Sequence, residues 1–387
     1  MHAKVEVTVD GQPVAGAFYE RLIELSCEDK EGIESDRFDA KLNDGPPDFL
    51  AMPRKGAIVI VKLGLGMMPP RQVGRYVVDT VKGNCLPYSV SIGGKAADLR
   101  KGKLKTRGEK HWDGKTVEQI VKDVAGDVGL TAKVAPGIGQ HKYDWMAQQD
   151  ETPLHFLERL ARRHNALLTV KDGNLVFAER GGGMALSGAS MGQIIVTPDK
   201  VVQGSLEFEY SDRNAYGKVT AYYQDKSKAK RIEVEAAGGG ASDSVYRLTE
   251  PYADAAEADK AAQAKAKQLK RGEGSFSVEM EGDTGITAGA PLVCRDIRPG
   301  LDGVPWLIES VTHSYSKSGG FRSKITAKLY DGKSGKGSGS SSSTSENGGG
   351  TASAASPAGT PPANAPDNVS AGPNPGWAKG GVRLDQR

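Results

Sequence analysis

The chain has 387 residues, enough for two or three domains that each bury a core. Its 51 Lys and Arg residues nearly balance its 48 Asp and Glu residues, and the net charge of +3 gives no overall signature of a nucleic-acid-binding protein. The three cysteines, Cys27, Cys85 and Cys294, are widely spaced and form no CxxC pair. This spacing argues against a disulfide framework or a zinc site and favours folding in a reducing compartment.

The first stretch of the chain alternates apolar and polar residues, as in Val5, Val7 and Val9 before the Asp10-Gly11 turn. It has no apolar segment of signal-peptide length, and no run approaches the roughly 20 apolar residues that cross a bilayer. We therefore expect a chain made soluble in the cytoplasm. Further strand-like runs cover 57–63, 76–81 and 88–92. Residues 1–99 are predicted to form a β-barrel or sandwich.

Residues 100–200 are predicted to form an α+β insert. Thr116 and Gln119 have the spacing of a capping box, and a helix with one apolar face follows and ends at Gly129. A basic connector precedes this helix: Lys101, Lys103, Lys105, Arg107 and Lys110. It could contact nucleic acid, but a solvated loop is the preferred interpretation.

The clearest helix of the chain begins within the insert after Asp150 and Glu151, two acids that the helix dipole favours at this end. Thr152 is suited to the N-cap, and Pro153 fits the first helical position because its missing N–H costs nothing there. The apolar residues on one face are Leu154, Phe156, Leu157, Leu160 and Ala161. Asn165 is a plausible left-handed stop. A hairpin of 167–170 and 175–177 is predicted across Asp172-Gly173.

Strands return in residues 201–331, the predicted second β domain. The strand-like runs are 206–210, 218–223, 231–235, 276–280, 291–295, 306–311 and 322–329. An Ala- and Lys-rich segment, 254–271, is predicted to be a helix. Because this segment offers few large apolar side chains, we expect it to lie against the barrel surface or to face a neighbouring subunit.

The two β regions repeat the same order of pieces. Phe38–Leu42, Gly56, Val59-Ile60 and Tyr76–Val81 correspond to Phe276–Met280, Gly289, Leu292-Val293 and Trp306–Val311. The last pieces agree best, since both read aromatic, aliphatic, aliphatic, acid, hydroxyl, valine. Strands reuse a small set of residues, but the shared order favours a duplicated barrel.

No residue pattern indicates catalysis or cofactor binding. The six histidines are His2, His111, His141, His155, His164 and His313, and none belongs to an HExxH motif or a CxxC-linked ligand set. Asp150 and Glu151 could suggest a general acid and base, but adjacent carboxylates at a helix start are more typical of dipole and cap partners. We therefore expect no catalytic, metal or cofactor residues.

Two motifs resemble those of the late control protein D family, the hub proteins at the tip of contractile phage tails. The first consists of Gln148, Glu151, Thr152, Phe156, Leu157, Arg159, Leu160 and Ala161. The second runs from Trp306 to His313 and is followed by Gly319-Gly320-Phe321. The hub region of type VI secretion spike proteins carries a similar first motif. The resemblance covers roughly residues 1–331 and implies a structural role for these motif residues, with packing or hydrogen bonding for His313.

The resemblance implies a mainly β fold with an α+β insert: two tube-like β-barrel domains, a small helix-hairpin domain and a low-complexity tail. It also implies a virion baseplate protein that forms a homotrimer, whose six quasi-equivalent barrels join a hexameric tail tube to a trimeric spike. The expected partners are the tail tube protein, the central spike protein, the baseplate wedge proteins and the tape measure protein, with DNA only as passing cargo. The alternative is a tail-associated peptidoglycan hydrolase or cell-wall-binding protein.

Residues 332–387 are rich in Gly and Ser and then in Ala and Pro, a composition that cannot bury enough apolar surface to offset its ordering entropy. We predict a disordered tail when the chain is alone. Trp377 and Leu384 near its end motivate the hypothesis that it binds the spike or lines the channel. Secretion spike hubs usually continue into a long β-spike, and this different continuation argues for a separate spike protein.

Overall fold

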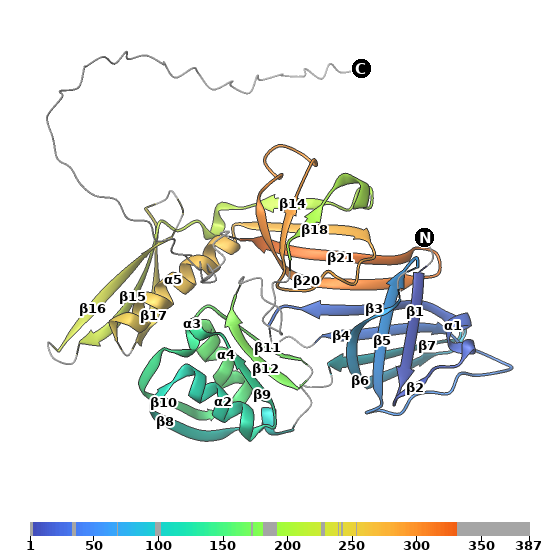
Figure 1. Ribbon diagram of the computed structural model, residues 1–387, viewed down its shortest axis with the longest axis horizontal. Helices are drawn as coiled ribbons and strands as arrows, with labels where there is room; N and C mark the ends of the chain where they lie inside the picture. The colour runs from blue at the N-terminus through green and yellow to red at the C-terminus, as the bar shows by residue number, and fades with distance from the viewer. Residues whose placement is uncertain are drawn as a thin grey trace, which may run out of the picture. The chain divides into compact units, whose positions relative to one another are not determined.

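The computed structural model describes residues 3–32, 36–67, 69–96, 102–171, 173–180, 192–225, 229–238, 240, 243–252 and 254–330 (Figure 1). The tail predicted for 332–387 lies outside these residues, as do Lys101 and the turn residue Asp172. The mainly β prediction with an α+β insert is confirmed. None of the described helices has the length and apolar character needed to span a bilayer.

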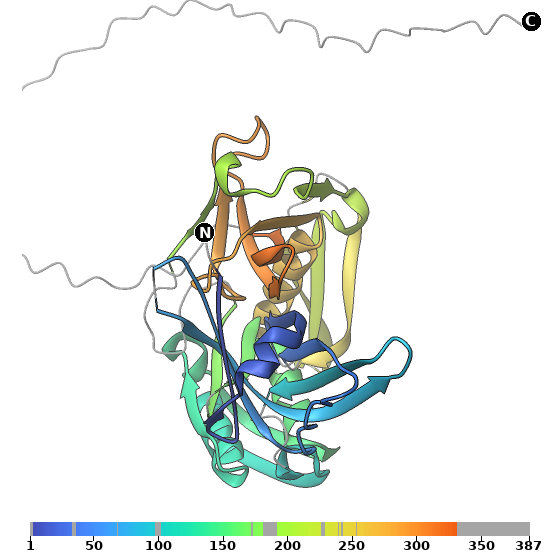
Figure 2. The same ribbon diagram turned by 90° about the vertical axis from the view of Figure 1, so that its right-hand side faces the viewer.

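The first β module, residues 3–96, curves an antiparallel sheet around one apolar core in the order β3-β4-β7-β6-β5-β1-β2. Its strands are β1 (Ala3–Val9), β2 (Gln12–Pro13), β3 (Leu22–Lys30), β4 (Arg37–Asn43), β5 (Ile58–Leu65), β6 (Arg71–Asn84) and β7 (Ser89–Ala96). Alternating burial along β4 puts Phe38, Ala40 and Leu42 inside. The short helix α1 (Gly16–Arg21), dark blue near the centre of Figure 2, packs Phe18 on this core. The hydroxyl of Tyr19 accepts a hydrogen bond from the Val7 N–H at 3.1 Å, which holds α1 beside β1.

The insert has its own core between two small sheets and two main helices. Its elements are η2 (Gly102–Lys105), β8 (Gly108–Thr116), α2 (Val117–Asp127), β9 (Thr131–Val134), α3 (Pro136–Gly139), β10 (Lys142–Glu151), α4 (Pro153–Arg163), β11 (Ala166–Lys171) and β12 (Asn174–Glu179). The capping box of Thr116 and Gln119 is present at the start of α2. Thr152 caps α4, and Asn165 adopts the left-handed conformation (φ 49°) after it. Strands β8 and β10 form one sheet, and β11, β12 and β9 form the other.

The second β module surrounds a core centred on Trp306. Its elements are β13 (Ile194–Val196), η3 (Pro198–Lys200), β14 (Glu207–Tyr210), β18 (Gly274–Glu281), β19 (Pro291–Cys294), β20 (Pro305–Ser316) and β21 (Gly320–Leu329). Strand β13 pairs in parallel with β19, although its residues fall in the range predicted for the insert. After β13 the chain reaches β18, where Val202 N–H donates to the Glu279 carbonyl at 2.8 Å. This bond closes the sheet around the core.

A small satellite unit is inserted between β14 and β18. It consists of η4 (Asp212–Asn214), β15 (Lys218–Asp225), β16 (Lys230–Ala237), β17 (Val245–Tyr252) and α5 (Ala255–Arg271). Helix α5 packs mainly on the β16-β15-β17 sheet, whereas the sequence predicted that it lies against the barrel surface or faces a neighbouring subunit. Its buried alanines explain the difference, because small side chains let a helix lie close to a sheet without large apolar residues. Four of these alanines are Ala258, Ala261, Ala262 and Ala266.

The strand pairing of the first module is repeated in the second. The order β3-β4-β7-β6-β5 corresponds to β14-β18-β21-β20-β19, and every neighbouring pair in both series is antiparallel. The predicted echo is therefore present in the hydrogen-bonded topology. The modules differ at one end, because β1 pairs antiparallel with β5 whereas β13 pairs parallel with β19.

The repeat extends to single backbone hydrogen bonds. In the first module Gly56 N–H donates to the Val78 carbonyl at 2.8 Å, and in the second Gly289 N–H donates to the Ile308 carbonyl at 2.8 Å. Both glycines have positive φ, 91° and 84°, a conformation that glycine adopts without a side-chain clash. The strand register then shifts directly after Val78 and after Ile308. A bulge repeated at the equivalent position of both modules is hard to produce by coincidence of strand composition.

The two modules share one continuous sheet. Strand β3 of the first module pairs antiparallel with the C-terminal half of β20 of the second, with Cys27 opposite His313 (Figure 1). Each module has its own core, and Phe321 of β21 packs into the core of the first module.

Candidate functional site

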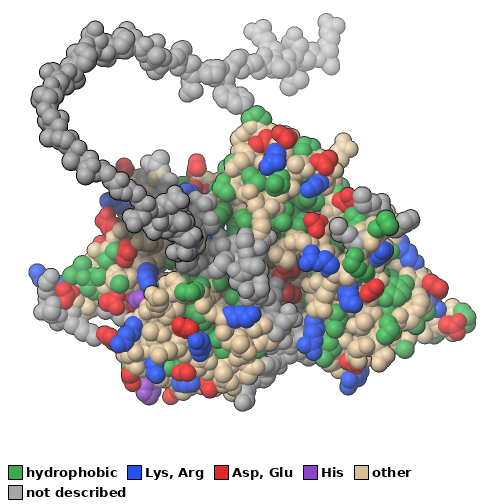
Figure 3. Space-filling model, in the orientation of Figure 1, with side chains coloured by type: hydrophobic (Ala, Val, Ile, Leu, Met, Phe, Trp, Pro, Cys, Tyr) green, Lys and Arg blue, Asp and Glu red, His purple; other side chains and the backbone are tan. Residues whose placement is uncertain are grey.

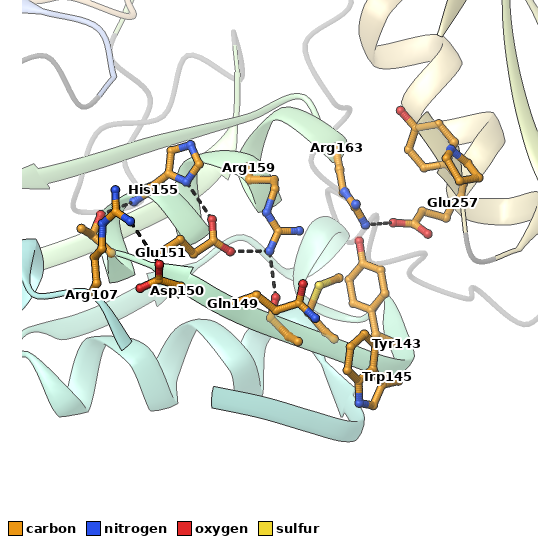
Figure 4. Close-up of a pocket in the computed structure, with 15 residues that line it drawn as sticks. Arg107, Tyr143, Trp145, Gln149, Asp150, Glu151, His155, Arg159, Arg163 and Glu257 are labelled. Carbon is orange, nitrogen blue, oxygen red and sulfur yellow. Dashed lines mark hydrogen bonds and ion pairs between the residues drawn. The ribbon is translucent and has the colours of Figure 1, made fainter. Parts of the chain in front are cut away.

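Three residues of the first motif, Glu151, Thr152 and Arg159, line a cleft of about 760 Å³ between the insert and the satellite unit (Figure 4). Strand β10 contributes Tyr143, Trp145 and its last residue Glu151, and the first turn of α4 contributes His155. The remaining wall includes Arg159 and Arg163 of α4 and Tyr252 and Glu257 from the satellite unit. The cleft is lined by charged and aromatic side chains, most of which already have partners.

Three motif residues form one network that holds β10 against α4. Glu151 accepts from Arg159 Nη2 at 2.5 Å and contacts His155 Nδ1 at 2.7 Å. Arg159 Nη2 also donates to the carbonyl of Ala147 at 2.8 Å, and Gln148 Nε2 donates to the carbonyl of Glu151 at 2.7 Å. The spacing of the first motif therefore serves to fix the strand-to-helix turn.

The adjacent acids Asp150 and Glu151 have different surroundings. Asp150 pairs with Arg107 at 3.2 Å, and both side chains are largely exposed. Burial raises the pKa of Glu151, but the hydrogen bonds from Arg159 and His155 outweigh it and lower that pKa below its usual value. Glu151 is thus an ionised, hydrogen-bonded carboxylate, which suits an anchor and not a general acid.

Glu151→Gln should lower the free energy of unfolding by about 1.5–3 kcal/mol, because it weakens the charge-assisted hydrogen bonds of a carboxylate whose side chain is only 12% exposed. Asp150→Asn is the matched control, with an expected loss of about 0–1 kcal/mol for an exposed pair. Urea denaturation of both variants tests the difference. Equal losses at the two positions would contradict the anchoring role.

A second polar contact joins α4 to the satellite unit. Arg163 Nη1 lies 2.8 Å from Glu257 Oε1, and the side chain of Glu257 is only 1% exposed. Beside this pair, the hydroxyl of Tyr143 is hydrogen bonded to His164 Nε2 at 2.8 Å, and the ring of His141 packs edge-on against both. The pairing of Arg163 with Glu257 has no local sequence pattern, since the two residues are 94 positions apart.

Burial and the neighbouring His141, Lys260 and Arg163 lower the pKa of His164 to about 3. Burial also lowers the pKa values of His141 and His313. These imidazoles are neutral in the folded protein, whereas an unfolded histidine titrates near pH 6.5. Between the lowered pKa of each folded histidine and about pH 6.5, the unfolded chain binds more protons than the folded chain. The free energy of unfolding therefore falls as the pH decreases below about 6.5.

We expect the free energy of unfolding to decrease between pH 7 and pH 5, with His164 contributing up to about 1.4 kcal/mol per pH unit. His164→Asn should reduce this slope by removing one of the titrating groups. Denaturant titrations at several pH values measure the slope for each protein. An unchanged slope in the variant would show that His164 is solvated and protonated in the folded chain.

The second motif lies on β20 at the junction of the two modules. Trp306 is fully buried in the second core. His313, 2% exposed, contacts the hydroxyl of Ser323 through Nδ1 at 2.9 Å and the carbonyl of Ile286 through Nε2 at 3.2 Å. A neutral imidazole satisfies both contacts by donating to the carbonyl and accepting from the hydroxyl.

The structure separates the predicted motif residues into two places. The apolar members Phe156, Leu157 and Leu160 are buried in the insert core, near the network of Gln148, Glu151, Thr152 and Arg159. Trp306 and His313 belong to the second module and its junction with the first. No group of three or more metal-ligating side chains is assembled among the described residues.

The basic connector is partly neutralised by acids of the insert. Besides the Arg107–Asp150 pair, Lys110 Nζ lies 2.7 Å from Asp127. Across the face shown in Figure 3, the described basic and acidic side chains are interspersed. These pairs favour the solvated loop over a nucleic-acid contact.

Comparison with known proteins identifies the relatives of this chain. Residues 70–319 match the family described as phage tail baseplate hub (GPD). The probable baseplate hub protein of Escherichia phage 186 is 30% identical over 353 residues, covering 81% of this chain and 90% of that protein. The probable baseplate hub protein of Escherichia phage P2 is 30% identical over 349 residues, covering 80% and 89%. The 43 kDa tail protein of prophage MuSo2 from Shewanella oneidensis shares the fold, with a TM-score of 0.65, 18% identity and coverage of 84% and 98%.

Proposed function

Because the chain belongs to the phage tail baseplate hub family, we propose that it is the hub of a contractile tail or tail-like particle and that it forms a homotrimer. In this trimer the two β modules of each chain supply six similar units arranged as a ring. Such a ring has true threefold and approximate sixfold symmetry. It can join a hexameric tail tube on one face to a trimeric central spike on the other.

The observation that carries this proposal is the repeated hydrogen-bond pattern of the two modules. An adapter between sixfold and threefold partners needs two units per chain with the same backbone shape. The matching bonds of Gly56 to Val78 and of Gly289 to Ile308, each 2.8 Å long, supply that likeness. The same series of five antiparallel strands surrounds each core.

The insert and satellite unit would remain available for other contacts. We assign four parts, 1–99, 100–200, 201–331 and 332–387, with β13 joined to the second module because it pairs with β19. The proposed partners are the tail tube, central spike, baseplate wedge and tape measure proteins, and DNA passes through the ring as cargo. Synthesis in the host cytoplasm precedes assembly into the virion.

The proposed role involves no turnover of a substrate. The Glu151 carboxylate that could act in a peptidoglycan hydrolase is instead bonded to Arg159 and His155. A muralytic assay of the purified chain should therefore detect no activity. Activity that disappears in Glu151→Ala would favour the hydrolase.

The decisive measurement is the mass of the full chain in solution. Native mass spectrometry and light scattering should give three times the 40.9 kDa mass of one chain. Electron micrographs should show rings with six similar lobes. A chain that stays monomeric at all concentrations, including after mixing with its tube protein, would contradict the proposal.

A further inference from the structure

Strands β3 and β20 join the two modules within one chain. The strands equivalent to them, β14 and β6, each have an edge that lacks such a partner within the described part of the chain. Strand β20 pairs with β21 along one edge. On its other edge, residues 305–307 pair with β19 and residues 310–316 pair with β3. The C-terminal half of β20 thus accepts a strand from the other module.

The equivalent strands in the repeat are β6 for β20 and β14 for β3. Strand β6 pairs with β7 as far as Asn84, while its other edge pairs with β5 only as far as Val77. Among the described residues, no strand pairs with this second edge of β6 between Thr80 and Asn84. Within the same part of the chain, β14 pairs with β18 alone. An unpaired edge presents N–H and C=O groups ready to accept another strand.

We propose that β14 of one copy pairs antiparallel with the open edge of β6 in the next copy, in the register of the β3–β20 junction. This proposal rests on the proposed trimer and specifies its contact. Each chain would offer one β6 edge and one β14 edge. A head-to-tail contact of this kind closes into a ring when three copies complete the rotation.

The repeat fixes which residues lie opposite one another. Val78 corresponds to Ile308 through the matched bulge, so Lys82 corresponds to Thr312. Phe38 and Phe276 correspond, and their partners on the neighbouring strands are Cys27 and Phe208. Glu209 therefore corresponds to Glu28, one residue further along.

Because Thr312 lies opposite Glu28 inside the chain, Lys82 of one copy lies opposite Glu209 of the next. The two side chains have opposite charges and emerge on the same face of the sheet. Neither forms an ion pair with another described residue. A directly opposed pair of opposite charges stabilises an antiparallel contact.

Exposed apolar side chains flank both open edges. At the β6 end, Phe49, Met52 and Leu86 are 58%, 59% and 82% exposed, and at the other end Tyr210 of β14 is 48% exposed. In the internal junction, the loop after β18 contacts β3 where Ala288 N–H donates to Asp29 at 2.9 Å. In the repeat, the loop after β4 is equivalent to the loop after β18, and it carries Phe49 and Met52. Tyr210 of β14 is equivalent to Asp29 of β3. The contact between copies would replace this polar bond with apolar burial.

A charge exchange tests the predicted register. Lys82→Glu and Glu209→Lys should each raise the concentration at which the ring dissociates by roughly tenfold or more, because like charges then face each other at three contacts. The double variant with both changes should restore trimers. Sedimentation velocity measures assembly, and circular dichroism checks that each chain is folded. Variants that stay trimeric like the unmodified chain would overturn the register.

Disulfide trapping gives a second readout that does not depend on charge. In a Cys85→Ser background, which removes the exposed native thiol, Lys82→Cys with Glu209→Cys should yield covalent dimers and trimers under oxidation. Lys82→Cys with Glu207→Cys is the matched control, since a diagonal pair lies about 7–8 Å apart and should link poorly.

The outcomes separate this inference from the trimer itself. The strand pairing would be overturned if the chain is trimeric but Lys82→Cys with Glu209→Cys gives no cross-link and the charge substitutions do not change trimer dissociation. The proposed function would remain intact in that case. A chain that is monomeric before any substitution would overturn both. Linked trimers together with rescue by the charge exchange would support the pairing.

Discussion

Trp306→Ala should lower the free energy of unfolding of the second β module by about 3–5 kcal/mol. The indole is fully buried, lies 5.3 Å from the ring of Phe276, and fills the centre of the module's core. Truncation removes its transfer free energy and leaves a cavity that the surrounding strands cannot fully close. Hydrogen exchange at the amides of β18, β20 and β21 measures the loss within this module.

Trp306→Phe is the control for the loss of volume. The indole N–H is buried without a hydrogen-bond partner among the described residues, so removing it relieves a desolvation cost. We expect Trp306→Phe to cost about 1–2 kcal/mol less than the alanine variant. Tyr76, the equivalent residue, stacks on Phe38 at 5.5 Å, and Tyr76→Ala should weaken the first module in the same way. A Trp306→Ala chain with unchanged exchange would show that its core is not what holds the module together.

The elements that sequence reasoning placed well are those fixed by local chemistry. Thr152 and Thr116 each use a hydroxyl to bond an N–H three residues onward, and this requires no distant partner. The left-handed turn at Asn165 likewise depends on the residue itself. Capping and turn chemistry operate within a few residues, so their pattern is visible in the chain before it folds.

The pairing of strands that are far apart in the sequence could not be predicted from local patterns. The sequence indicated two similar β modules, but it did not predict that β3 and β20 join them. The residues of an edge strand do not determine which other strand will pair with it. Strand β13 is only three residues long and pairs in parallel, too short for a periodic signal. The alanine-rich α5 buries only one large apolar side chain, Leu269, because its small alanines let it lie close to the sheet beneath it.

The first motif illustrates how a family pattern can be recognised before its reason is known. Gln148, Glu151 and Arg159 are singled out by the resemblance to the family motif, and the acids before the helix suggested dipole partners. The structure shows a more specific cause, since Arg159 links the carboxylate of Glu151 to the carbonyl of Ala147. The motif therefore fixes a turn and leaves Arg163, one helical turn onward, to make the contact with the satellite unit.

Glu257→Ala should lower the free energy of unfolding by about 3–5 kcal/mol, because it leaves the partly buried guanidinium of Arg163 without its 2.8 Å partner. Arg162→Ala is the neighbouring control: its i,i+4 pair with Glu158 is 68% and 35% exposed, so we expect a loss of about 0.5 kcal/mol or less.

The double variant Arg163→Met/Glu257→Ala should recover much of the lost stability, since no unpaired charge remains beneath α5. Differential scanning calorimetry of the unmodified chain, the single variants Arg163→Met and Glu257→Ala, and the double variant forms a double-mutant cycle for this contact. If Glu257→Ala costs no more than Arg162→Ala, Arg163 is solvated in the folded chain and the insert and satellite unit are held together by their apolar contacts alone.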